Sequence, residues 1–382
     1  MKRLLSLILC TIIFVFSVPM FSVYGAQPNL NGEAKSVILI EANTGKVLYE
    51  YEADLRLPPA SVTKIMTILL VVEELDKGTI KLTDNVQVSE RASKMGGSQV
   101  YLKAGEIMSV NDLLKSVVVA SANDASTALA EYVSGSVEAF VERMNQRAKE
   151  LGMTSTVFEN PTGLDDSVTD HLISARDIAT MSRELLSHPM IFDYTTIWMD
   201  TIRNGEFGLS NTNRLIRFYN GANGLKTGST SKAGFCISAS ALRDGMQLIA
   251  VVMGSPTRDS RNETAKALLD YGFSTYRYYE YKQNQIGTIR VKGGVNNSCT
   301  LVCSEFESVM GKDEYAKGIK SECEIPESIS APVKAGDTVG KMIFKSGDQI
   351  IGTADIVAGQ SVERISFMGI IKKLIGSFFY SK

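Results

Sequence analysis

Histidine is scarce in this 382-residue chain, which contains only His171 and His188. The scarcity excludes a histidine-rich metal site, and it makes any Ser-His-Asp mechanism depend on one of these two side chains. An excess of charge is missing as well, because 40 Lys and Arg residues nearly balance 42 Asp and Glu residues. A formal net charge of -2 gives no global basic field, so nucleic acid is not an expected partner.

Cysteine is also infrequent, with five residues in the chain. No pair has the spacing of a zinc site with histidines nearby, so the sequence predicts no metal. Cys236 lies in an apolar strand pattern, which favours a buried free thiol. A disulfide between Cys303 and either Cys299 or Cys323 is compatible with the sequence, which leaves both alternatives open.

The composition that remains is that of an ordinary globular protein, with 44% hydrophobic and 21% charged residues. The length suffices for two or three domains and a sizeable buried core. We detect no internal repeat and no low-complexity segment.

The first 26 residues have the pattern of a secretory signal peptide. Met1-Lys2-Arg3 form a basic head, an apolar run follows over residues 4–21, and the small residues Gly25 and Ala26 suit a cleavage site. A membrane-spanning anchor is the alternative, since a run of this length could just span a bilayer. We expect cleavage and a mature protein that acts outside the cytoplasm.

Residues 361–382 predict an amphipathic helix. Apolar residues recur there at steps of three and four, which is one face of a helix: Ile365, Met368, Ile371, Leu374, Ile375, Phe378 and Phe379. Arg364, Lys372, Lys373 and Lys382 lie mostly off that face. Such a helix suits the plane of a membrane interface, where basic residues gain from anionic lipid. The alternative is a terminal helix packed on its own domain.

An antiparallel sheet flanked by helices, an α+β fold, is predicted for residues 27–278. Strand patterns at 35–41 and 46–52 flank the turn Asn43-Thr44-Gly45, and helical patterns dominate over 60–187. A second group of strands and a helix are predicted at 225–230, 234–242, 246–254 and 261–271. We expect the first hairpin to complete the edge of the sheet.

A small all-β domain is predicted for residues 279–360, where helical periodicity stops. An aromatic stretch over 276–281 precedes it. Its strand candidates, separated by Gly and Pro, are 286–291, 299–303, 342–345 and 349–356.

Ser61 and Lys64 lie three residues apart at the predicted start of an apolar helix. This spacing places both side chains on one face of the helix. A lysine in apolar surroundings loses stability in its charged form, so its pKa should fall. A neutral amine beside a hydroxyl can take the hydroxyl proton, which predicts a serine nucleophile activated without histidine.

Two further short motifs contain side chains that could take part in binding or catalysis. Ser121-Ala122-Asn123 follows an apolar helix, where a serine and an amide could hydrogen-bond a lysine and a peptide carbonyl; the alternative for such a pair is helix capping. Lys226-Thr227-Gly228 lies in a predicted strand. The lysine and threonine could hold a carboxylate there, and the glycine would let a ligand approach closely.

The order and setting of these motifs resemble a known family. Ser61, Ser121 and Lys226 fall on a helix start, a helix–helix loop and a strand, as in serine acylases that act on D-Ala-D-Ala peptides and β-lactams. The chain is similar to low-molecular-weight penicillin-binding proteins, specifically D-alanyl-D-alanine carboxypeptidases, over about residues 33–275. The segments that carry this resemblance are PPASVTKIMT, GGSQVYLKAGE, SANDAS, NPTGL, HLISARDIA and GLKTGSTSKAGF.

The resemblance implies a β-lactamase/transpeptidase-like fold and a role for each motif residue. Ser61 would attack the carbonyl between two D-alanines and carry the acyl group, with Lys64 as its base. Ser121 would relay a proton to the leaving amine, and Asn123 would bind the substrate amide.

Substrate binding is implied in the same way. Lys226 and Thr227 would engage the terminal carboxylate, beside Gly228. The backbone N–H groups of the nucleophile and of Ser229 would form the oxyanion hole. Arg261 would add a second carboxylate contact, and Arg258 competes for that role.

By resemblance, the protein would remove the terminal D-alanine from peptidoglycan pentapeptides on the outer face of the cytoplasmic membrane. β-Lactams would inhibit it, and no cofactor is expected. The alternatives are a β-lactamase or a non-catalytic wall-binding protein of the same fold. We interpret Glu159 as a loop residue rather than a deacylating base, Asp177 as a residue that pins its loop, and His171 as non-catalytic.

Overall fold

The computed structural model describes residues 29–166 and 168–372, so the predicted signal peptide lies outside the described residues. The elements below all belong to the compact unit Asn31–Lys382.

A five-stranded antiparallel sheet of order β2-β1-β9-β8-β7 forms the centre of the fold. The hairpin of β1 and β2 completes one side of it, as the sequence predicts. Asp244 and Gly245 both have positive φ in the turn between β8 and β9, as a tight hairpin requires. The strands are β1 (Ser36–Glu41), β2 (Val47–Tyr51), β7 (Ala222–Thr230), β8 (Gly234–Arg243) and β9 (Met246–Ser255).

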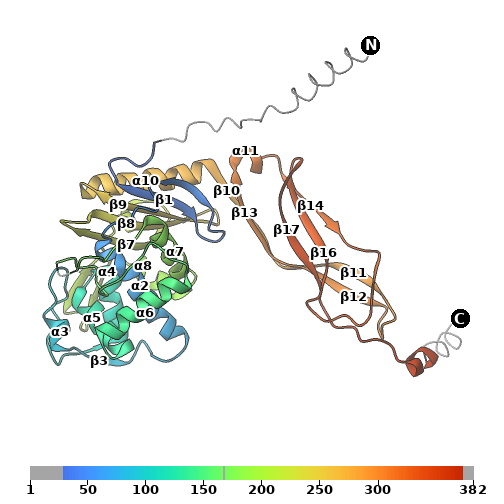
Figure 1. Ribbon diagram of the computed structural model, residues 1–382, viewed down its shortest axis with the longest axis horizontal. Helices are drawn as coiled ribbons and strands as arrows, with labels where there is room; N and C mark the ends of the chain where they lie inside the picture. Colours follow the sequence, from blue (N-terminus) through green and yellow to red (C-terminus); the bar gives the residue numbers. More distant parts are fainter. Residues whose placement is uncertain (1–28, 167, 373–382) are drawn as a thin grey trace, which may run out of the picture. The chain divides into compact units, whose positions relative to one another are not determined.

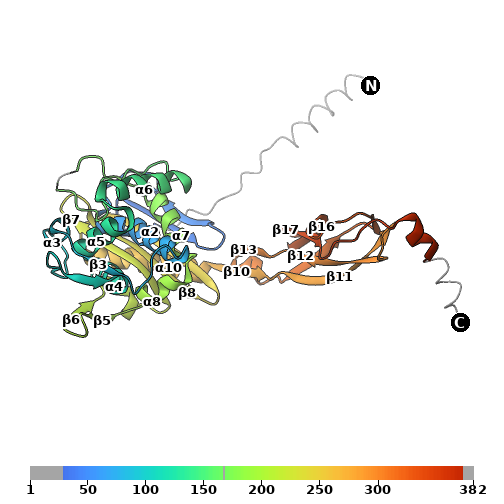
Figure 2. The ribbon, with the colours of Figure 1, turned by 90° about the horizontal axis from the view of Figure 1, so that it is seen from below.

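Helices cover both faces of this sheet (Figures 1 and 2). Helix α10 (Arg258–Thr275) packs on one face, where Gly272 lies against Leu39 and Leu248. Helix α7 (Ala175–Leu186) packs on the other face, where Ser182 hydrogen-bonds Ser238 at 2.8 Å. The remaining longer helices are α4 (Val110–Val119), α5 (Asn123–Ser134) and α6 (Val137–Glu150).

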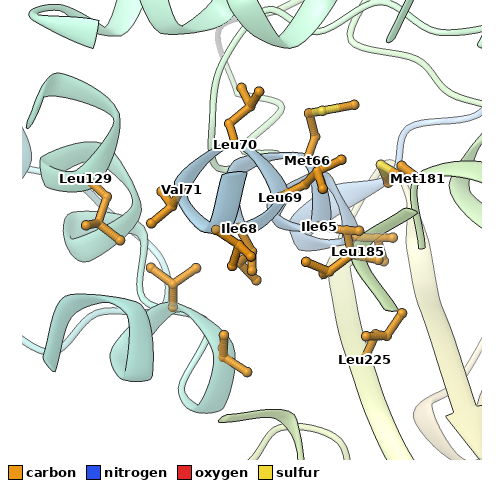
Figure 3. Packing of buried hydrophobic residues seen from close by; sticks show 14 of the residues in the cluster. Ile65, Met66, Ile68, Leu69, Leu70, Val71, Leu129, Met181, Leu185 and Leu225 are labelled. Carbon is orange, nitrogen blue, oxygen red and sulfur yellow. The ribbon is translucent and has the colours of Figure 1, made fainter. Parts of the chain in front are cut away.

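Helix α2 (Lys64–Asp76) runs through the main hydrophobic core (Figure 3). Its first nine residues are all buried, so apolar side chains surround it on every side. Leu129 of α5, Met181 and Leu185 of α7, and Leu225 of β7 contribute to the same core. Burial on all sides fixes the helix start, and with it the position of Ser61.

Several elements differ from the sequence predictions. Helix α10 begins at Arg258 rather than at 261, because the Thr257 hydroxyl caps it by accepting from the Ser260 N–H. Short strands interrupt the predicted helical region and the stretch before β7: β3 (Asn85–Gln87), β4 (Ile107–Ser109), β5 (Met199–Ile202) and β6 (Phe207–Ser210). The short helices are η1 (Ala60–Thr63), α3 (Glu90–Ser93), η2 (Pro189–Ile191), α8 (Phe192–Thr195), α9 (Leu215–Phe218) and α11 (Lys312–Tyr315).

The carboxy-terminal region contains a six-stranded sheet of order β14-β16-β17-β12-β11-β15. All four predicted strands occur within longer ones, and the aromatic stretch 276–281 is itself a strand, β10, paired with β13. The strands are β10 (Tyr276–Tyr281), β11 (Asn284–Lys292), β12 (Ser298–Cys303), β13 (Phe306–Gly311), β14 (Ile319–Glu324), β15 (Ser328–Ser330), β16 (Thr338–Ser346) and β17 (Gln349–Ala358).

The four cysteines of the described region are all free thiols, so neither predicted disulfide forms. Cys299 and Cys303 lie four residues apart in strand β12, which separates them by roughly 13 Å, too far for a bond. Cys323 lies on β14, where its thiol contacts the Met342 sulfur at 3.6 Å. Cys236 is fully buried, as predicted.

The described part of the carboxy-terminal segment reaches residue 372. Val362 is buried and packs with the β-sheet core, and a helical turn covers residues 367–372. Phe367, Met368 and Ile370 are exposed on this turn. Within the described residues, no helix is both long and apolar enough to cross a membrane. The rest of the predicted amphipathic helix, 373–382, lies outside the described residues.

Candidate active site

Ser61 lies in the short helix η1, immediately before α2. Ala60, the residue before it, has φ of 50°, an unusual conformation for a residue with a side chain. The Ser61 hydroxyl lies 2.9 Å from the amine of Lys64, and Ser61 lines a cavity of about 590 Å³. The predicted nucleophile and base are therefore in contact.

The Lys64 amine is fully buried and lies near three oxygen atoms. Besides the Ser61 hydroxyl, it donates to Asn123 Oδ1 at 2.6 Å and to the Thr162 carbonyl at 2.7 Å. Burial, and then the charge of Lys226, hold the pKa of Lys64 well below its usual range. A neutral amine has two N–H groups and one lone pair. With both N–H groups on Asn123 and Thr162, the lone pair would face the Ser61 hydroxyl.

The Thr162 carbonyl is held in place by its own loop, residues 159–163. The Asn160 side chain accepts from the N–H groups of Thr162 and Gly163 at 3.0 and 2.7 Å. Gly163 has φ of 80°, and a Cβ there would lie 1.8 Å from the Ala60 carbonyl. The NPTGL segment thus packs tightly against the turn that carries the nucleophile.

Ser121 lies on the loop between α4 and α5 that the sequence predicts, and Asn123 is the first residue of α5. Ser121 has φ of 62° and lines the cavity. Asn123 binds protein groups through both ends of its amide, Lys64 at the oxygen and the Gly96 carbonyl, at 2.7 Å, at the nitrogen. Its backbone N–H donates to the Ser98 carbonyl at 2.7 Å. Asn123 therefore ties the 96–98 loop to Lys64; it is not among the residues that line the cavity, and the substrate contact predicted for it stays a prediction.

Strand β7 borders the cavity with Thr227, Gly228 and Ser229. A Cβ on Gly228 would lie 2.7 Å from the Ser61 backbone nitrogen. Gly228 is therefore needed so that β7 can lie close to the turn that carries Ser61, whereas the sequence analysis expected it to let a ligand approach closely. Lys226 is buried behind the cavity and donates to the Thr227 carbonyl at 3.0 Å. Burial and the nearby Arg261 lower the pKa of Lys226 to about 7.

Arg261 and Arg258 both line the cavity from the first turn of α10. Arg261 is 3% exposed and donates to the Asn262 side chain at 2.8 Å and to the Cys236 carbonyl at 3.3 Å. Both predicted candidates for the second carboxylate contact are therefore present at the same wall.

The predictions missed part of the cavity wall. Ser98 belongs to the GGSQVYL segment, so the family resemblance could have indicated it. The others come from short elements before β7 that have no clear periodicity: Trp198, Ser210, Asn211, Thr212, Arg214 and Phe218. A larger cavity, of about 1120 Å³, lies against α7, β1 and β2 and contains none of the motif residues.

His171 holds the 159–171 loop against the nucleophile turn. Its Nδ1 accepts from the Glu159 N–H at 2.9 Å, so Nε2 carries the proton and donates to the Thr63 hydroxyl at 2.8 Å. Burial is the main cause that lowers the pKa of His171 to about 4. It therefore acts as a structural link, in line with its predicted non-catalytic role.

Glu159 and Asp177 both hold loops, as predicted. The Glu159 carboxylate accepts from the N–H groups of Thr169 and Asp170, each at 3.1 Å. Asp177 accepts from the Ser155 N–H and the Thr156 hydroxyl at 2.9 and 2.7 Å.

A serine hydroxyl beside a buried lysine, at the edge of an antiparallel sheet, defines a serine acyl-transfer enzyme in which an amine replaces imidazole as the base. The comparisons with known proteins agree. The family profile described as D-alanyl-D-alanine carboxypeptidase matches residues 23–257, and that of the penicillin-binding protein 5 C-terminal domain matches 273–364.

Individual relatives span almost the whole chain. It is 42% identical to D-alanyl-D-alanine carboxypeptidase DacF of Bacillus subtilis, over 99% of each sequence. Penicillin-binding protein 5 from Haemophilus influenzae superposes with a TM-score of 0.76 at 32% identity, covering 87% of this chain and 98% of that one. Penicillin-binding protein D2 from Listeria monocytogenes, solved with ampicillin bound, has a TM-score of 0.60 at 31% identity and covers 64% of this chain and 100% of its own. The chain belongs to the D-alanyl-D-alanine carboxypeptidase family of serine peptidases.

Proposed function

We propose that the chain removes the terminal D-alanine from peptidoglycan stem pentapeptides through an acyl-enzyme on Ser61, and that β-lactams acylate the same residue. The contact between the Ser61 hydroxyl and the buried Lys64 amine carries this proposal. Relatives named as D-alanyl-D-alanine carboxypeptidases support the substrate, and the ampicillin-bound neighbour supports the inhibitor class.

Acylation would begin when Lys64 takes the Ser61 proton. Ser61 Oγ then forms a bond to the carbonyl carbon between the two D-alanines. As the C–N bond breaks, the proton passes to the leaving amine by way of Ser121. Water later cleaves the ester, and the serine regains its proton. Lys64 can act as a base at neutral pH because burial disfavours its charged form.

Binding would orient the substrate along β7. The backbone N–H groups of Ser61 and Ser229 are the proposed oxyanion hole, and donors in such a position are each worth about 10²–10³ in rate. Thr227 and Arg261 line the cavity, and the charge of Lys226 lies behind it, which suits the terminal carboxylate.

The second candidate function, a β-lactamase, requires a group that activates water for rapid deacylation. None of the described residues that line the cavity is Asp or Glu, and Glu159 is engaged in its own loop. We therefore expect a slowly released penicillin adduct. A fluorescent penicillin followed over time separates the two functions, because rapid turnover would favour the lactamase.

We propose that residues 1–26 direct export and that the mature chain consists of a catalytic domain over 27–278, a β-rich domain over 279–360 and a membrane-associating helix over 361–382. Relatives named as D-alanyl-D-alanine carboxypeptidases support action outside the cytoplasm, because the peptidoglycan substrate proposed for the chain lies there. The exposed Phe367, Met368 and Ile370 favour attachment of the terminal helix to the outer face of the cytoplasmic membrane over packing on its own domain.

Release of D-alanine from a synthetic pentapeptide tests the function directly. The wild-type chain should release it, and Ser61→Ala should abolish release while leaving the fold intact. Unchanged release by Ser61→Ala would refute the mechanism, and no release by the wild-type chain would favour the non-catalytic wall-binding alternative.

A further inference from the structure

A cluster of metal-binding side-chain types lies outside the active site, where the ends of helices α2 and α7 meet. Glu73 and Asp76 belong to the last turn of α2, Glu184 belongs to the last turn of α7, and His188 follows that helix by two residues. One possible ligand atom from each of Glu73, Glu184 and His188 lies within 4.8 Å of the other two. Among the described residues, no other group of three His, Cys, Asp or Glu side chains has this geometry.

The packing of the two helices brings these residues together. Met181 and Leu185 of α7 lie beside α2 in the hydrophobic core (Figure 3). Asp76 and His188 are separated by 112 positions in the sequence. Spacing along the chain therefore predicted no metal, because the cluster forms only through tertiary contacts.

The histidine of this cluster is oriented by a carboxylate. His188 Nδ1 lies 2.5 Å from Asp76 Oδ2. When the neutral ring donates its Nδ1 proton to Asp76, the lone pair of Nε2 is available for a metal. Metal-binding histidines typically donate their other ring N–H to a carboxylate in this way, which fixes the tautomer.

The two glutamates are held by one guanidinium. Arg147 donates from Nε to Glu73 Oε1 at 2.8 Å and from a terminal nitrogen to Glu184 Oε1 at 2.6 Å. Within the described residues, neither Glu73 nor Glu184 accepts a hydrogen bond at Oε2. Arg147 therefore fixes the two carboxylates side by side and leaves one oxygen atom of each for a further partner.

Negative charge exceeds positive charge in this cluster. Three carboxylates, those of Glu73, Asp76 and Glu184, share the single guanidinium of Arg147, which also pairs with Glu150 at 3.5 Å. No lysine and no other arginine of the described chain pairs with these three carboxylates. A divalent cation would balance the excess. One imidazole nitrogen with carboxylate oxygens suits Zn²⁺ better than Ca²⁺ or Mg²⁺, which prefer oxygen ligands alone.

We propose that Glu73, Glu184 and His188 bind one divalent ion of the zinc type, with water as the fourth ligand and Asp76 as the group that orients His188. Bonds of about 2.1 Å in a tetrahedral site place ligand atoms roughly 3.4 Å apart, so the glutamate side chains must close slightly around the ion. Both can do so, because each has three rotatable bonds and is partly exposed.

The ion would tie the end of α2 to the end of α7. Asp76 lies roughly 18 Å along α2 from Lys64, so the site is structural and takes no part in acylation. It is independent of the proposed function, which neither requires it nor depends on its test.

Nuclear magnetic resonance of the imidazole rings tests the site in the wild-type chain. The chain contains only two histidines, so the signals of both rings can be followed while Zn²⁺ is added to chelator-washed protein without an affinity tag. Zn²⁺ should shift the ring signals of His188. Those of His171 should stay in place, because both of its ring nitrogens are already hydrogen-bonded, to Glu159 and Thr63.

Variants identify the ligands, with Zn²⁺ binding measured by calorimetry. We expect one ion per wild-type chain, an affinity about 100-fold lower in His188→Ala and Glu184→Gln, and an affinity about 10- to 100-fold lower in Asp76→Asn. Glu74→Gln is the matched control, because it removes the same charge from the neighbouring position of α2. Glu74 pairs with Arg143 and Lys77 instead, so this variant should bind Zn²⁺ as the wild-type chain does.

The melting temperature adds a second readout. Saturating Zn²⁺ should raise it in the wild-type chain and not in His188→Ala, since an ion that binds only the folded state stabilises that state. Ca²⁺ should have neither effect. Penicillin acylation at the wild-type rate shows that each variant is folded. His188 ring signals that ignore Zn²⁺, equal Zn²⁺ affinity in His188→Ala, or an equal response to Ca²⁺ would overturn the inference and reduce the cluster to an ion-pair network around Arg147.

Discussion

Lys64 has three oxygen atoms within hydrogen-bond distance of its amine, and burial, followed by the charge of Lys226, favours the neutral form of this amine. Its pKa is lowered, so the amine is protonated only at pH values below that reduced pKa. Penicillin acylation should therefore fall as the pH decreases through this pKa, and it should level off above it. An ordinary lysine, with a pKa near 10.4, would leave little base at neutral pH. The pH dependence of the acylation rate measures this decrease, which is the acid limb of the pH profile. A rate that rises as the pH falls would contradict the assignment of Lys64 as the base.

Gly228 is the residue whose side chain would interfere most directly with the nucleophile. In Gly228→Ala the new Cβ would lie 2.7 Å from the Ser61 nitrogen and 2.9 Å from the Val62 nitrogen. Since both contacts are to backbone, the turn must shift, and we expect acylation by penicillin to fall by about 10² or more.

Gly208→Ala is the control for this change, because Gly208 has open space where its Cβ would lie. It should acylate at the wild-type rate. Equal rates for the two variants would show that contact between β7 and the nucleophile turn is unimportant.

At the scale of elements, the 159–171 loop and the nucleophile turn act as one assembly. His171 links them through Glu159 and Thr63. His171→Ala removes both hydrogen bonds, so acylation should slow roughly tenfold while the acid limb of its pH profile stays in place. Loss of that limb would mean that His171, rather than Lys64, titrates during catalysis.

The other histidine of the described chain provides the control for this variant. His188 contacts Asp76 at 2.5 Å and lies outside the site. His188→Ala should retain the wild-type acylation rate and pH profile.

Elements with strong periodicity could be predicted from the sequence, and those without it could not. Helix α2 and strands β7 to β9 carry long apolar patterns, and they place Ser61, Lys64 and Thr227 together. Strands β5 and β6 and helix α9 have four residues each, which is too short for a period to appear. They reach the site only through tertiary contacts such as that between Thr212 and Thr227, so Trp198 and Arg214 were missed.

At the scale of the whole molecule, the sequence indicates charges of opposite sign in different parts. The segment from residue 361 has four basic residues and one acidic residue, or +3, whereas the complete chain is at -2. This contrast predicts that the mature chain binds vesicles of anionic lipid more strongly than neutral ones.

A truncated chain tests this prediction. Because Val362 belongs to the β-sheet core, the truncation should end after Arg364 rather than before residue 361. We expect the shortened chain to remain in the supernatant of a vesicle sedimentation assay and to keep its activity on soluble peptides. Equal sedimentation of both chains with anionic vesicles would refute attachment through the terminal helix.

The identity of the acylated residue tests the mechanism most directly. Mass spectrometry of the chain after brief treatment with penicillin should find one adduct, on the peptide that contains Ser61, and none in Ser61→Ala. An adduct on another residue, or an adduct that persists in Ser61→Ala, would contradict the proposed nucleophile and every role assigned around it.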